Sequence, residues 1–126
     1  MYMLLAIACG GALGALARHK VGSVAMHLFG SGFPYGTIIV NIAGSFLLGL
    51  LAGGLAFRFS LPLEARAFLI VGFCGAFTTF STFALDVATL TERGNLMLAG
   101  VYVALSVAGA ILAMFGGLAV MRGLFA

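Results

Sequence analysis

The chain has 126 residues, of which 63% are hydrophobic and only 7% are charged. A soluble domain of this size cannot bury so much apolar surface, because small domains expose a large share of their surface to solvent. The net charge of +3 comes from residues near the ends of apolar segments, without a basic run, which argues against a nucleic-acid partner. The composition therefore predicts one all-α transmembrane domain over residues 1–126, with membrane lipid as a partner.

The first half of the chain offers two membrane-spanning segments. A spanning helix needs about 20 apolar residues, and we expect the first at about residues 3–26 and the second at about residues 37–57. Gly10 and Gly14 lie about one turn apart on the first helix, so they would let a neighbouring helix approach closely. The linker between the two spans is rich in turn-forming residues.

The third span, at about residues 65–90, is predicted to be interrupted in the middle of the membrane. Ser60, Pro62 and Glu64 predict a cap and a first turn for this helix. Its centre, residues 72–83, combines glycines with Thr and Ser, which are weak helix formers. A break at membrane depth is tolerated only where the freed backbone groups face protein, water or an ion.

Polar side chains recur on single faces of the second helix and of a fourth span, which is predicted at about residues 96–121 with Asn95 as its N-cap. Residues four apart share a helix face. The polar residues are Thr37, Asn41 and Ser45 on the second span and Tyr102 and Ser106 on the fourth. A lone Ser or Thr in a membrane helix often bonds back to its own backbone. Polar groups at this depth are nevertheless costly, and together they predict a polar pathway.

The predicted pathway offers hydrogen-bond donors with few nearby carboxylates. Asn41 has two N–H donors, and the hydroxyl groups can turn a proton inward. Phe80 and Phe83 on the third span can present ring edges, which carry the positive end of the aromatic quadrupole, although ordinary packing would also explain such a pair. Several close donors in a narrow pore can replace the water around a very small anion. The residues thus point to a small anion without naming it.

Positive charges are balanced between the two sides of the predicted bundle. Four spans put both termini on one side, and orientation normally follows an excess of Lys and Arg in cytoplasmic loops. The cations are Arg58, Arg66 and Arg122 on one side and Arg18, Lys20 and Arg93 on the other. This balance predicts insertion in both orientations and pairing of opposite copies about a two-fold axis in the membrane plane. The alternative is that one of these charges lies too deep in the membrane to count, which would leave an orientation bias. Arg18 and Lys20 are candidates to attract anions to a vestibule, with anchoring at the membrane interface as the alternative.

Three segments, at residues 10–18, 36–46 and 72–83, resemble the Fluc (CrcB-type) family of fluoride channels, and the similarity covers nearly the whole chain. The third segment is the most specific of them. The resemblance implies an antiparallel, dual-topology homodimer with two pores in the bacterial inner membrane. It also implies passive export of fluoride, which lowers fluoride toxicity in the cytoplasm.

The resemblance further implies roles for pore residues, position by position. Asn41 would contact fluoride, and Phe80 and Phe83 would line the pores as a phenylalanine box. Polar pore residues of the family correspond to Thr37, Tyr102 and Ser106.

A structural sodium ion is also implied by the resemblance, at the centre of the dimer interface. The backbone carbonyls of Gly75 and Thr78, at the expected helix break, would hold this Na⁺. This role agrees with the preference of hard cations for oxygen ligands and with the carbonyls that a broken helix sets free.

Two other functions stay open at this point. A proton-coupled exporter similar to the small multidrug resistance transporters needs an intramembrane carboxylate, and Asp86, near the end of the third span, is the candidate for it. A structural subunit of a larger membrane complex would also use glycine-rich helix faces, but it would leave the Asn41 stripe unexplained. An enzyme is not expected, because the sequence holds no recognisable nucleophile–base pair or metal cluster.

Overall fold

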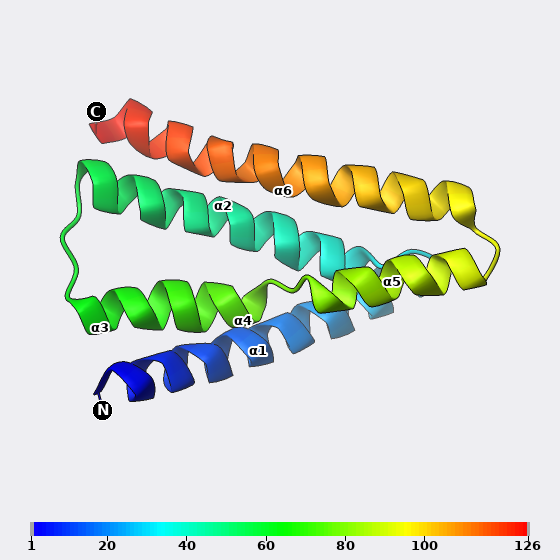
Figure 1. Ribbon diagram of the computed structural model, residues 1–126, viewed down its shortest axis with the longest axis horizontal. Helices are drawn as coiled ribbons and strands as arrows, with labels where there is room; N and C mark the ends of the chain where they lie inside the picture. The colour runs from blue at the N-terminus through cyan, green and yellow to red at the C-terminus, as the bar shows by residue number, and fades with distance from the viewer. Residues whose placement is uncertain (1, 126) are drawn as a thin grey trace.

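The structure is a computed structural model that describes residues 2–125 of the chain, and the regular secondary structure of this part is helical (Figure 1). Three long helices are continuous: α1 (Tyr2–Phe29), α2 (Tyr35–Phe57) and α6 (Leu96–Phe125). The third span consists of α3 (Leu63–Arg66), the π-helix η1 (Ala67–Cys74), α4 (Gly75–Phe77) and α5 (Ser81–Glu92). Each of the four spans is long and apolar enough to cross a membrane, which confirms the predicted set of four.

The N-cap predicted for the fourth span is confirmed, and the one predicted for the third span is wrong. The carbonyl of Asn95 accepts the Ala99 N–H at 2.9 Å, so Asn95 occupies the N-cap position predicted for the fourth span. The predicted cap at Ser60 is wrong, because Pro62 is the N-cap of α3 and makes no side-chain cap bond. The carbonyl of Pro62 accepts the Arg66 N–H at 3.1 Å instead, and Glu64 lies in the first turn as predicted.

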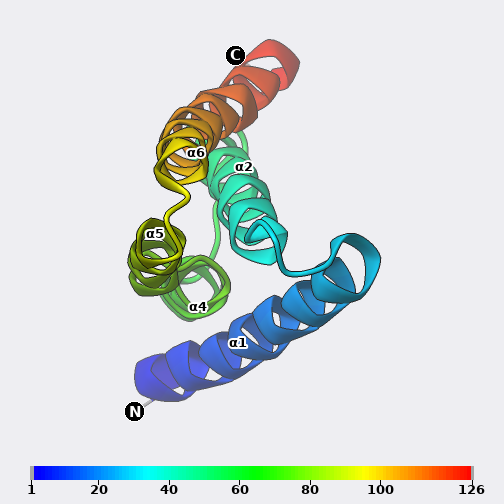
Figure 2. The ribbon, with the colours of Figure 1, turned by 90° about the vertical axis from the view of Figure 1, so that its right-hand side faces the viewer.

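Glycines determine how closely the helices pack. The largest helix contacts join α2 to α6 and α1 to η1, and Figure 2 shows α2 and α6 side by side at one edge of the bundle. On α1, a Cβ atom at Gly10 would collide with the Phe68 carbonyl, and one at Gly14 would collide with the Phe73 carbonyl. The small-residue step predicted on the first helix is therefore a helix–helix contact.

The third span is interrupted between α4 and α5. Thr78 is extended, with φ −88° and ψ 158°, and α5 begins only at Ser81. The Thr78 N–H still donates to the Cys74 carbonyl at 3.1 Å, and the Thr78 hydroxyl donates to the same carbonyl at 2.8 Å. The interruption predicted from the Gly- and Thr-rich segment is thus present within the span, visible in Figure 1 as the thin stretch between the two helices.

The outer surface of the bundle is apolar. Large side chains such as Leu16, Leu112 and Phe115 are each more than 60% exposed. In water such a surface would be unstable, whereas lipid tails solvate it. Both ends of the chain lie at one end of the bundle, together with the loop between α2 and α3 (Figure 1).

Candidate ion pathway

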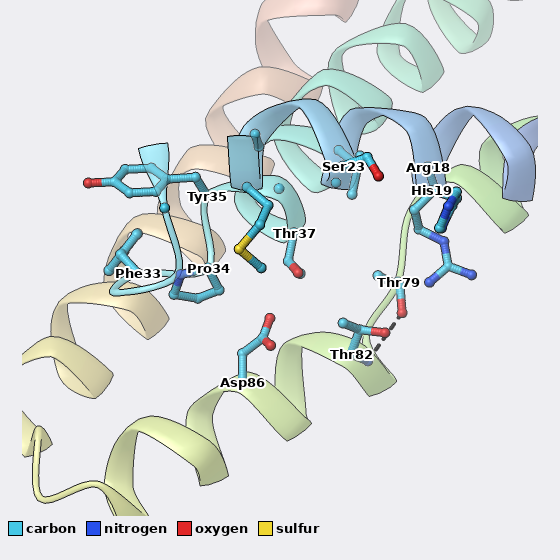
Figure 3. A pocket seen from close by; sticks show the side chains of 16 residues that line it. Arg18, His19, Ser23, Phe33, Pro34, Tyr35, Thr37, Thr79, Thr82 and Asp86 are labelled. Atoms are coloured by element: carbon cyan, nitrogen blue, oxygen red, sulfur yellow. Dashed lines mark hydrogen bonds between the residues drawn. The ribbon is translucent and has the colours of Figure 1, made fainter. Parts of the chain in front are cut away.

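Two cavities lie on either side of the helix break. The first, of about 440 Å³, lies between α1, α2 and α5, and Figure 3 shows its polar side chains. The second, of about 280 Å³, lies between α2, the break and α6. Thr79 lines both cavities, so the backbone of the break forms part of the wall between them.

Asn41 connects α2 to the break through both ends of its amide. Its Nδ2 donates to the Thr79 carbonyl at 3.0 Å, and its Oδ1 accepts the Thr79 N–H at 2.8 Å. An amide in a membrane helix is costly without such partners. Asn41 lines the second cavity, where Ser45, one turn further along α2, also lies.

Phe80 and Phe83 are brought together beside the second cavity. Their ring centroids are 5.5 Å apart, and the ring planes are tilted by 41°. They differ in exposure, because Phe80 is 79% exposed in a single chain and Phe83 is 9% exposed. Phe83 packs against the Tyr102 ring, with centroids 5.3 Å apart.

Tyr102 and Ser106 lie on the buried face of α6. Tyr102 is fully buried and its hydroxyl donates to the Asp86 carboxylate at 2.8 Å. Ser106 is 5% exposed, and its hydroxyl oxygen finds no hydrogen-bond partner within residues 2–125. Thr37 lines the first cavity and Ser106 the second, so these polar residues are distributed over both.

Asp86 is the functional candidate whose role the sequence left open. It lines the first cavity (Figure 3). Its carboxylate also accepts the Tyr102 hydroxyl across the contact between α5 and α6. Sequence spacing cannot reveal this pair, because the two residues lie on different helices. The signal that could have found it is the rarity of a carboxylate inside an apolar span.

The two cations proposed for a vestibule are separated by the structure. Arg18 lines the first cavity, and its Nε atom is buried with no hydrogen-bond partner within the described residues (Figure 3). Lys20 is exposed and lies outside the lining of this cavity. Arg18 is therefore the cation in position to act on an ion there.

Gly75 is the first residue of α4 and Thr78 follows its last residue, so the carbonyls of both lie next to the break. In a continuous helix the Thr79 N–H would donate to the Gly75 carbonyl four residues earlier, but here it donates to Asn41. The Gly75 carbonyl thus lacks its usual helical donor. Residues 2–125 contain no group of three or more His, Cys, Asp or Glu side chains that could hold a metal.

Comparison with known proteins places the chain in a family. Residues 5–118 match the family model described as "CrcB-like protein, Camphor Resistance (CrcB)". The chain is 49% identical to the fluoride-specific ion channel FluC 1 of Nitrobacter hamburgensis, over 94% of both chains. It is 50% identical to the fluoride-specific ion channel FluC of Chelativorans sp., over 98% of this chain and 99% of the relative. The chain is a multi-pass membrane protein and belongs to the CrcB-like family.

Proposed function

We propose that this protein is a fluoride-selective channel that exports fluoride passively across the bacterial inner membrane and so lowers fluoride toxicity in the cytoplasm. Relatives of about half identity over nearly the full length carry the name fluoride-specific ion channel. The observation that carries the proposal is the second cavity. Its lining combines neutral hydrogen-bond donors with two phenyl rings, and among the described residues it includes no charged side chain.

The chemistry of this lining suits a very small anion. Fluoride gives up its water only where several close donors replace it. Two donors are available for this purpose. One Nδ2–H of Asn41 bonds Thr79 and leaves the second N–H, and the Ser106 hydroxyl has no hydrogen-bond partner within the described residues. The ring edges of Phe80 and Phe83 add positive quadrupole ends. Arg18 in the first cavity would concentrate anions before they reach these donors.

The proposed pathway also includes Thr37 and Tyr102 as polar residues. Thr37 lines the first cavity, and the Tyr102 hydroxyl is held by Asp86 at 2.8 Å. A hydroxyl that bonds a carboxylate also reduces the repulsion between that carboxylate and a passing anion. In this proposal Asp86 acts as the hydrogen-bond partner of Tyr102.

The assembly we propose is an antiparallel homodimer with two pores. The balance of cations between the two ends of the bundle supports insertion in both orientations. Phe80 supports a partner as well, because a pore-lining ring that is 79% exposed in one chain needs a second surface to enclose the ion.

A structural Na⁺ at the dimer centre fits the break. The carbonyls of Gly75 and Thr78 would hold it, and two-fold symmetry would supply the same two oxygens from the partner. When bound, the ion would neutralise carbonyl dipoles that cannot reach water. Replacing Na⁺ by N-methylglucamine should weaken assembly or transport, and full activity in its absence would contradict this site.

The proposed function is tested by fluoride efflux from liposomes that contain the purified protein. We expect rapid efflux driven by the fluoride gradient alone, with no dependence on a proton gradient. A proton-coupled exporter would need the proton gradient, and a structural subunit would give no efflux. Either of those results would overturn the channel proposal.

A further inference from the structure

The amide of Asn41 is committed to the main chain of a residue 38 positions away. Both bonds to Thr79 are short, at 2.8 Å and 3.0 Å, and they run in opposite directions. A peptide N–H can only donate and a carbonyl can only accept. The orientation of the Asn41 amide is therefore fixed: its oxygen faces the Thr79 N–H, and its nitrogen faces the Thr79 carbonyl.

The bond to Oδ1 competes with a helical bond. Without Asn41, the nearest acceptor along the chain for the Thr79 N–H is the Gly75 carbonyl, four residues earlier. Thr78, between them, is extended at ψ 158°, a value that no α-helix allows. The side chain of Asn41 thus replaces the acceptor that would otherwise continue α4 through the break.

The side chain of Thr79 also makes a hydrogen bond at the break. The Thr79 hydroxyl accepts the Thr82 N–H at 3.2 Å, which gives the first turn of α5 an acceptor. The Thr79 side chain therefore bonds the first turn of α5, while the Thr79 backbone bonds Asn41 on α2.

We propose that Asn41 is a positioning residue that holds the helix break open and thereby releases the Gly75 carbonyl. This role rests on the proposed function only in its link to Na⁺, and it is separate from any contact between Asn41 and fluoride. The two bonds to Thr79 leave the second Nδ2–H of Asn41 available, so the side chain offers the pathway a donor.

The backbone conformation of Thr78 tests this proposal without any transport assay. We expect its Cα and Cβ chemical shifts, measured by NMR of the full chain in lipid nanodiscs, to be typical of extended backbone in the wild type. Asn41→Leu removes both bonds and should move these shifts towards helical values. Ser45→Ala, on the same helix and cavity, is the matched control and should leave them unchanged.

Asn41→Asp separates positioning from ion contact. This variant keeps an oxygen for the Thr79 N–H but replaces the Nδ2 donor, which bonds the Thr79 carbonyl, by a second oxygen. The bond to Oδ1 is the one that replaces the helical acceptor, so Thr78 should stay extended while fluoride flux falls. Extended shifts at Thr78 in folded Asn41→Leu protein would overturn the positioning role. Asn41→Ala, which also removes both bonds, takes the place of Asn41→Leu if that variant does not fold.

The link to Na⁺ is measured by the Na⁺ concentration that half-stabilises the protein against thermal denaturation. We expect Asn41→Leu to need at least about tenfold more Na⁺ than the wild type, which corresponds to about 1.4 kcal/mol, and Ser45→Ala to match the wild type. An unchanged Na⁺ midpoint in Asn41→Leu would overturn the link. A wild type that does not respond to Na⁺ would refute the proposed ion site, while the Thr78 shifts still decide the role of Asn41.

Discussion

Phe80 and Phe83 differ in burial, and this difference separates their effects on function and stability. We expect Phe80→Ile and Phe83→Ile each to reduce fluoride flux by at least about tenfold, because an aliphatic chain has no positive ring edge. Phe83 is 9% exposed and packs against Tyr102, so Phe83→Ile should lower the stability by about 1–3 kcal/mol. Phe80 is 79% exposed within its own chain, so Phe80→Ile should lower the stability less than Phe83→Ile. Liposome efflux and thermal denaturation measure the two effects, and wild-type flux in both variants would refute the pore lining.

The hydrogen bond between Tyr102 and Asp86 is a second residue-scale feature. The two oxygen atoms are 2.8 Å apart and Tyr102 is fully buried, so the bond should couple the two residues energetically. A double-mutant cycle with Tyr102→Phe and Asp86→Ala should give a coupling energy of about 1 kcal/mol, between the values usual for membrane helix contacts and for charged hydrogen bonds. Additive effects on thermal stability would show that the bond contributes nothing.

Single residues were predictable from the sequence where their chemistry forces a partner. Asn41 was predicted as part of a polar pathway because an amide at membrane depth is costly, and its amide bonds across to the break. The Tyr102–Asp86 bond was not predictable, because it depends on how α5 lies against α6. Lys20 and Arg18 looked equivalent in the sequence, and only the packing of α1 distinguishes them.

The close contact between α1 and η1 is the feature of helix packing that can be tested most directly. A Cβ at Gly10 would collide with the Phe68 carbonyl, whereas one at Gly22 would meet nothing within 4 Å. We expect Gly10→Ala to lower the thermal stability by about 1–3 kcal/mol, because backbone cannot move aside as a side chain can. Gly22→Ala is the matched control and should be neutral or slightly stabilising, since Ala is the better helix former. Equal stability of the two variants would contradict the close contact.

The elements themselves were largely predictable, since each span is long and predominantly apolar. The break was predicted from its glycines and hydroxyl residues and lies between Phe77 and Ser81. The π-helix η1 was not predicted. Its sequence, Ala-Phe-Leu-Ile-Val-Gly-Phe-Cys, suits an α-helix equally well, and local composition cannot distinguish the two hydrogen-bond registers.

The whole molecule carries its cations evenly, and this leads to a prediction about insertion. Reporter fusions at the C-terminus, one active only in the cytoplasm and one only outside it, should both be active, because neither side has an excess of Lys and Arg. Adding several lysines after Arg122 should bias the C-terminus towards the cytoplasm. A single orientation in the unmodified protein would contradict the antiparallel dimer.

The central claim for the whole molecule is that neutral donors and phenyl ring edges replace the water around fluoride but not around a larger halide. The most direct test is the reversal potential of the purified protein in a planar bilayer, with fluoride on one side and chloride on the other. The account predicts a reversal potential far from zero, because fluoride carries the current and chloride does not. A potential near zero, with chloride as permeant as fluoride, would contradict it.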